Sequence, residues 1–150
     1  MNKNKSFLKS LQCASLGLVK PFVTERNMRI HFSVANLIIV FAHFYGLAKT
    51  EWAILFLAIG LVITAELENA VDTATSEISQ TAKTAKDAAA GAVLFAAIIS
   101  VAVGCFLFFD IRGIQSALGR VFSSPAVYLP CMALGTADIL FIILGGKIKI

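Results

Sequence analysis

The sequence predicts an all-α integral membrane protein with an N-terminal amphipathic interfacial helix, three transmembrane helices and a fourth. Composition is the first observation: 58% of the residues are hydrophobic and 15% are charged, whereas an ordinary soluble domain carries about 25% charged residues. The second observation is that mean hydropathy is +0.83. The third is a set of apolar stretches near the length of about 20 residues that a bilayer crossing needs. These stretches cover residues 29–48, 52–67, 88–109 and 126–145.

The segment before the first span is amphipathic. Apolar residues alternate irregularly with lysines and other polar residues from residue 3 to residue 19, a pattern typical of a helix lying at the membrane interface. We expect an interruption near Gly17 and Pro21. Polar residues also break the apolar run, and no clean small-residue cleavage site follows it, so a cleaved signal peptide is not expected.

The second and fourth spans are less regular than the others. The second is short in its apolar part, but residues 69–86 contain no Gly or Pro, so the helix is expected to continue beyond Glu66. Pro125, Pro130 and Asp138 interrupt the fourth span, which could cross the membrane, re-enter it or pack beside the other spans. We interpret Asp138 as hydrogen-bonded to neighbouring backbone or to Thr136 and not as a functional acid.

Basic residues predict the orientation in the membrane. They cluster before the first span, and Lys83 and Lys86 lie between the second and third spans, whereas the first connection offers only Lys49. The positive-inside rule therefore places the N-terminus and residues 68–87 in the cytoplasm, for a multi-pass protein of the plasma (inner) membrane. The net charge of +4 is small and lies near the span ends, so anionic lipid headgroups account for it and no nucleic-acid partner is expected.

Acidic and basic side chains are predicted to gather at one membrane depth. Ionisable groups at the edge of a membrane are costly, which makes them candidates for function. No phosphate-binding Gly-x-x-x-x-Gly-Lys-Ser/Thr motif is present, so any ATP site differs from a P-loop. The candidates are Glu25 before the first span, Glu66, Glu68 and Asp72 at the end of the second, and Lys86 and Asp87 at the start of the third.

Several motifs in one order carry a resemblance to a known family. They are Thr-Glu-Arg-Asn at residues 24–27 with His31 following, Glu51-Trp52, the acidic segment, and Lys86-Asp87 before a small-residue run. Over roughly residues 8–110 the chain closely resembles the prokaryotic diacylglycerol kinase and undecaprenol kinase family of small integral-membrane lipid kinases. The resemblance implies a lipid kinase domain over residues 1–110, a hydrophobic extension over residues 111–150, and a homotrimer that uses Mg²⁺ and ATP.

The resemblance also assigns roles to residues. Glu66 corresponds to the catalytic base for the lipid hydroxyl. Glu25 and Glu68 correspond to the metal ligands. Asp72, Lys86 and Asp87 are assigned to the nucleotide, and Asn69 is a possible substitute for the family's asparagine. These roles suit phosphoryl transfer, which needs magnesium on the phosphates, positive charge and a base near the acceptor.

One departure from the family lies between Glu66 and Glu68. The chain is about five residues shorter there than the family pattern, which in a helix amounts to about 7.5 Å of rise and a net rotation of about 140°. An active enzyme would then need local unwinding between residues 65 and 69, or a base supplied by another group. Otherwise catalysis is impaired.

Three functions follow from these observations. The leading one is ATP-dependent phosphorylation of a membrane lipid alcohol, undecaprenol or diacylglycerol, at the cytoplasmic interface. The second is a catalytically impaired homologue kept as a membrane scaffold or subunit. The third is a small proton-coupled transporter that uses Glu66, which leaves Lys86 and Asp87 unexplained. We interpret His31 as a hydrogen-bonded packing residue and not as a ligand.

Overall fold

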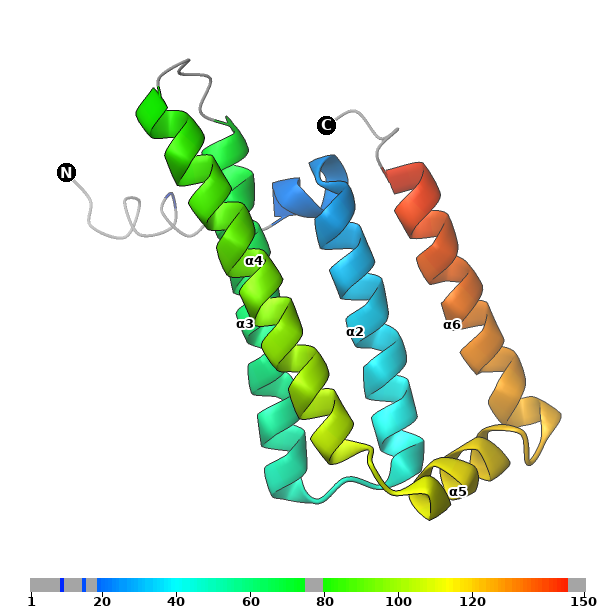
Figure 1. Ribbon diagram of the computed structural model, residues 1–150. Helices are drawn as coiled ribbons and strands as arrows, with labels where there is room; N and C mark the ends of the chain where they lie inside the picture. The colour runs from blue at the N-terminus through cyan, green and yellow to red at the C-terminus, as the bar shows by residue number, and fades with distance from the viewer. Residues whose placement is uncertain (1–8, 10–14, 16–18, 75–79, 146–150) are drawn as a thin grey trace.

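Long helices lie side by side in the computed structural model (Figure 1). The structure describes Lys9, Ser15 and residues 19–74 and 80–145, without the side chains of residues 68–74, 80–82, 85 and 86. The elements are α2 (Arg26–Tyr45), α3 (Lys49–Ala74), α4 (Gln80–Leu107), α5 (Ile111–Val121) and α6 (Pro125–Leu144). Within these described ranges every regular element is a helix, which confirms the all-α class.

Among the described residues, four helices are long and apolar enough to cross a membrane. The candidate spans are α2, residues Lys49–Leu67 of α3, Asp87–Leu107 of α4, and α6, close to the four stretches that hydropathy predicts. Large apolar side chains such as Phe95 and Leu57 remain about two-thirds exposed, at 67% and 66%. Exposed apolar surface on this scale suits contact with lipid or with other membrane helices. The chain is a multi-pass membrane protein.

Helices α3 and α4 form the most extensive helix pair. The Ser100 hydroxyl on α4 donates a hydrogen bond to the Ala58 carbonyl oxygen on α3, at 3.1 Å. As predicted, α3 continues past Glu66, and it ends at Ala74. Local unwinding between residues 65 and 69, one of the alternatives for an active enzyme, is not found, because α3 runs through that region without a break. Ala, Leu and Glu, which occupy positions 65–68, have high helix propensity, and they maintain the helix.

The chain before α2 also differs from the expectation. Residues 19–24 are helical and include Pro21, and the helix breaks at Glu25, which has extended backbone angles (φ −97°, ψ 121°) and is the N-cap of α2. The predicted interruption near Pro21 therefore lies four residues later, at Glu25. Gly17 and most of the expected interfacial helix lie outside the described residues.

Helix α5 was not predicted, and it lies across one end of the bundle (Figure 1). Its N-cap Asp110 accepts hydrogen bonds from the backbone N–H groups of Arg112 and Gly113, both at 3.0 Å. Apolar residues at 111, 114, 118 and 121 have the spacing of one helix face. The sequence thus contained a signal for α5, but the apolar period is short, because the helix has only 11 residues.

Helix α6 packs along α2 and has the length of a full crossing. Pro125 occupies its first turn and Pro130 lies inside it, yet α6 is continuous over 20 residues. Asp138 is buried, and its Oδ1 accepts a hydrogen bond from Asn36 Nδ2 at 3.1 Å. The predicted partner was wrong, because the Thr136 hydroxyl instead donates to the Ala133 carbonyl oxygen. A carboxylate within an apolar helix needs a polar partner, and α2 supplies it.

Candidate active site

A carboxylate and an imidazole meet between α2 and α3. Glu66 is only 1% exposed, and its Oε1 lies 3.1 Å from Nε2 of His31. A buried carboxylate is costly unless it is paired and hydrogen-bonded. His31, which the sequence analysis interprets as a hydrogen-bonded packing residue, directly contacts the predicted base. Two ionisable residues in neighbouring apolar spans were the sequence signal for this pair, but only the packing of α2 against α3 joins them.

Glu25 lies at the same end of the bundle as this pair. It is the residue directly before α2 and makes no side-chain cap hydrogen bond, so its carboxylate does not cap the helix. Arg29, which is 5% exposed, donates from Nη1 to the carbonyl oxygen of Val23 at 2.6 Å. This hydrogen bond fastens the chain just before Glu25 to the first turns of α2.

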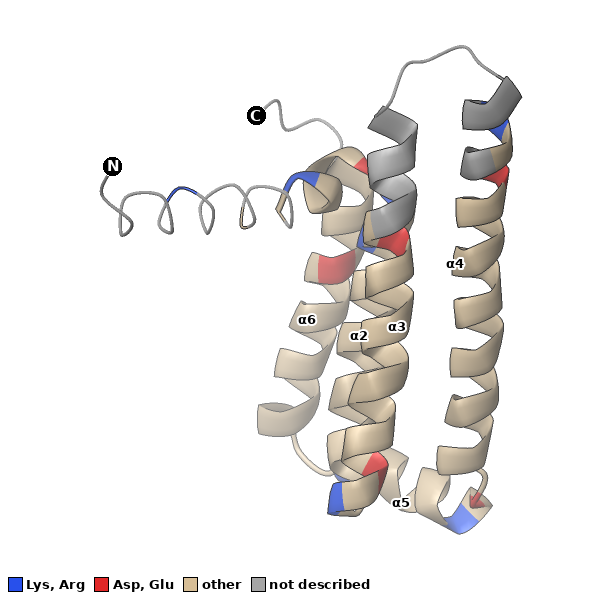
Figure 2. Ribbon diagram, turned by 90° about the vertical axis from the view of Figure 1, so that its left-hand side faces the viewer, with Lys and Arg blue, Asp and Glu red and all other residues tan. Residues whose placement is uncertain are grey.

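The remaining predicted site residues fall on the adjoining ends of α3 and α4. Glu68, Asn69 and Asp72 lie in the last turns of α3 and Lys86 in the second turn of α4, but these four side chains lie outside the described residues. Asp87 is exposed at the beginning of the α4 span. Figure 2 shows charged positions gathered toward the ends of the helices, with long uncharged stretches between them.

The continuous helix sets the relative directions of the α3 acids. Residues two apart in an α-helix differ by about 200°, so positions 66 and 68 lie on different sides of α3, whereas positions 68 and 72 share a side. With α3 unbroken, these two positions favour separate roles for Glu66 and Glu68 over a single ion held by both.

The donor set at this end fits magnesium. Within the described part of the chain no group of three His, Cys, Asp or Glu side chains lies close enough to hold a metal. Magnesium does not need such a cage, because it binds through one or two carboxylates, substrate phosphates and waters. Glu25 and Glu68 offer oxygen ligands of the kind that magnesium prefers over thiolate or imidazole.

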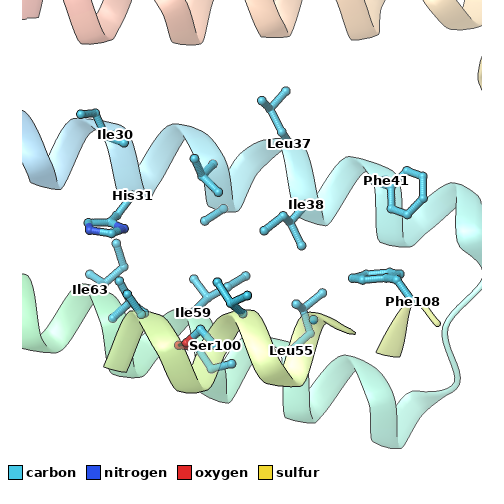
Figure 3. Close-up of a pocket in the computed structure, with 17 residues that line it drawn as sticks. Ile30, His31, Leu37, Ile38, Phe41, Leu55, Ile59, Ile63, Ser100 and Phe108 are labelled. Atoms are coloured by element: carbon cyan, nitrogen blue, oxygen red, sulfur yellow. Dashed lines mark hydrogen bonds between the residues drawn. The ribbon is translucent and has the colours of Figure 1, made fainter. Parts of the chain in front are cut away.

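An apolar cavity of about 630 Å³ lies between α2, α3 and α4. Figure 3 shows His31 at one end of this pocket and Phe41 with Phe108 at the other. Among the described residues that line it, His31 and Ser100 are the polar ones. The span from residue 31 to residue 41 along α2 corresponds to about 15 Å at 1.5 Å per residue. The pocket is therefore long and apolar, with its polar end at the partner of Glu66.

The aromatic end of the pocket is closed by ring contacts. The centroids of Phe41 and Phe108 lie 5.3 Å apart, and those of Tyr45 and Phe108 lie 5.1 Å apart, in edge-to-face arrangements. Such geometry is the favourable one for aromatic pairs.

Comparisons with known proteins identify the family of the chain. The model of the prokaryotic diacylglycerol kinase family matches residues 12–108. An undecaprenol kinase of Bacillus subtilis (strain 168) is 38% identical over 112 residues, which cover 71% of this chain and 91% of the relative. A diacylglycerol kinase of Synechocystis sp. (strain ATCC 27184 / PCC 6803 / Kazusa) is 40% identical over 109 residues, which cover 68% of this chain and 62% of the relative.

These matches define the class of protein as a lipid kinase, a phosphotransferase of the membrane. The chain belongs to the prokaryotic diacylglycerol kinase family. No solved structure matches it significantly. The family match ends at residue 108, so α5 and α6 lie outside the matched region.

Proposed function

We propose that the protein transfers the γ-phosphoryl group of ATP to the hydroxyl of a membrane lipid alcohol. The observation that carries the proposal is the buried Glu66 paired with His31 at the polar end of an apolar pocket. A lipid chain in the pocket would place its hydroxyl beside His31, the partner of Glu66, and ligand sites of this kind combine apolar walls with a few polar groups.

Each residue then has a role in the reaction. Glu66 accepts the hydroxyl proton while the lipid oxygen forms a bond to the γ-phosphorus, the bond to the β-phosphate oxygen breaks, and ADP leaves. His31 orients the Glu66 carboxylate by its contact at 3.1 Å. Lys86, Asp72 and Asp87 contact the nucleotide, with Asn69 as a possible further contact. Glu25 and Glu68 hold Mg²⁺, which when bound neutralises charge on the phosphates.

Undecaprenol is the acceptor that we favour, with diacylglycerol as the alternative. The support is that the relative whose length is 91% covered is named an undecaprenol kinase. The pocket is apolar over most of its length and suits a long hydrocarbon chain of either lipid.

A homotrimer is part of the proposal, with the N-terminus and residues 68–87 on the cytoplasmic side of the plasma (inner) membrane. Helices α3 and α4 carry exposed apolar side chains, and a Cβ at Gly60 or Gly91 would meet nothing within 4 Å. Small residues on such faces permit close approach of a second copy.

The test is phosphorylation of competing acceptors by the purified protein in detergent micelles. We expect magnesium-ATP to yield a phosphorylated lipid, with undecaprenol preferred over diacylglycerol. A micelle holds no gradient, so product formation excludes a proton-coupled transporter as the explanation. Absence of product with both lipids, in protein shown to be folded, would overturn the proposal.

That negative result would favour the second candidate, a catalytically impaired scaffold. The observation behind this alternative is the shortened segment between Glu66 and Glu68 within a continuous α3.

A further inference from the structure

Helices α2 and α6 pack against each other in antiparallel orientation, and their contacts define one alignment along their length. The pair Asn36 and Asp138 fixes the register near the middle of both helices, through the hydrogen bond of 3.1 Å. Toward the Glu66 end of the bundle, Gly145 at the end of α6 lies against Arg29 near the start of α2. The last turn of α6 is therefore held beside the first turns of α2.

One link runs from Gly145 through Arg29 to the chain before Glu25. Gly145 is buried, and a Cβ built there would approach Arg29 Cδ to 2.5 Å. The absence of a side chain thus lets the Arg29 side chain lie against α6. Arg29 in turn donates its hydrogen bond of 2.6 Å to the carbonyl oxygen of Val23, two residues before Glu25.

A second link reaches the same segment through aromatic rings. Phe141 on α6 contacts Phe32 on α2 with ring centroids 6.3 Å apart, and Phe32 contacts Phe22 with centroids 5.1 Å apart. Both contacts are edge-to-face, the arrangement that aromatic pairs prefer. Phe22 belongs to the helical stretch 19–24. Two separate chains of contact therefore connect the last turns of α6 to the segment that ends in Glu25.

We propose that α6 braces residues 19–25 and thereby positions the carboxylate of Glu25, with Gly145 and Phe141 as positioning residues. Glu25 has extended backbone between two helical stretches, so its place depends on what holds the stretch before it. The brace comes from beyond residue 108, where the family match ends. The inference rests on the proposed function only where it assigns magnesium to Glu25.

Hydrogen exchange tests the brace without reference to activity. Gly145→Ala is compared with Gly135→Ala, a matched control on the same helix, where the nearest atom to the new Cβ is Leu37 Cδ2 at 4.0 Å. Gly135→Ala raises helix propensity inside α6, whereas Gly145 is the C-cap of α6, so the control tests a Gly→Ala change in this helix without a close new contact. We expect Gly145→Ala to accelerate amide exchange over residues 19–25 by about threefold or more, and Gly135→Ala to leave it unchanged.

Phe141→Leu provides an independent variant that removes the aromatic link and leaves Gly145 in place. It should also accelerate exchange over residues 19–25. Unchanged exchange in both Gly145→Ala and Phe141→Leu, in protein with wild-type helix content, would overturn the brace.

Kinetics test whether the brace serves the magnesium ligand. In Gly145→Ala the magnesium concentration for half-maximal rate should rise by about fivefold, while kcat at saturating magnesium changes by less than about twofold. Gly135→Ala should match the wild type. If Gly145→Ala accelerates amide exchange over residues 19–25 but leaves the magnesium concentration for half-maximal rate unchanged, α6 does not position Glu25 for magnesium. If the wild-type protein phosphorylates neither lipid, the proposed function is wrong. The hydrogen-exchange experiment still shows whether α6 braces residues 19–25.

Discussion

The carboxylate of Glu66 and the imidazole of His31 lie 3.1 Å apart across the interface of α2 and α3. His31 also lines the apolar pocket, so this pair joins the predicted base to the space proposed for the lipid.

The first prediction concerns this pair. Glu66→Gln keeps the size of the side chain but removes the proton acceptor, and kcat should fall by about a hundredfold or more. His31→Asn should lower kcat by only about tenfold, since the proton acceptor Glu66 remains.

These rates are to be measured in mixed micelles, together with the thermal stability of each variant. Equal losses in both variants, accompanied by lower stability, would show that the pair supports the fold and not the reaction.

The second prediction concerns the metal and nucleotide ligands. Glu68→Gln and Asp87→Asn should each reduce activity by about a hundredfold or more, because each removes a contact to charge in the transition state. Glu77→Gln, a matched change in the same polar segment of the sequence, should do little. Equal losses at all three positions would indicate general destabilisation.

The third prediction tests the pocket. Ala97→Phe would fill part of the cavity, because Ala97 lines it, and the KM for lipid should rise by about tenfold with the KM for ATP unchanged. Ala102→Phe on the exposed side of α4 is the control. A parallel rise in both KM values for Ala97→Phe would contradict a lipid pocket.

The fourth prediction concerns the Asn36 and Asp138 hydrogen bond. A double-mutant cycle of Asn36→Ala and Asp138→Ala, followed by unfolding in detergent, should give a coupling of about 0.6 to 2 kcal/mol. Thr136→Ala serves as a control, since its hydroxyl bonds only within α6. A coupling of zero would mean that the two side chains do not meet in the membrane.

The fifth prediction addresses the shortened segment. If the native enzyme is impaired, inserting Leu-Asn-Thr-Ala-Ile between Leu67 and Glu68 should raise the rate of lipid phosphorylation. The insertion rotates position 68 about the helix axis by about 140° relative to Glu66 and adds about 7.5 Å to the rise between them. The steady-state rate of lipid phosphorylation is the measurement. A fully active native protein and an inactive insertion variant would contradict this interpretation of the gap.

Hydropathy predicted the four spans to within a few residues, because each span has a long apolar run and polar ends. The partners of Asp138 and Glu66 were not predictable in the same way. Asp138 meets Asn36, about a hundred positions earlier, and Glu66 meets His31; both contacts depend on which helices pack together and in what register. Helix α5 was missed for a different reason, since its apolar period is present but short.

The packing of α6 against α2 also determines what its removal would do. Arg29 and Ser33 are 5% and 2% exposed, and Asn36 is bonded to Asp138. A chain cut after residue 110 would deprive Asn36, near the middle of the α2 span, of its hydrogen-bond partner and would uncover Arg29 and Ser33, and unpaired polar groups within a membrane span are costly. Residues 111–150 therefore cannot be removed without a cost in stability, because the sequence of α2 is already adapted to having a helix beside it.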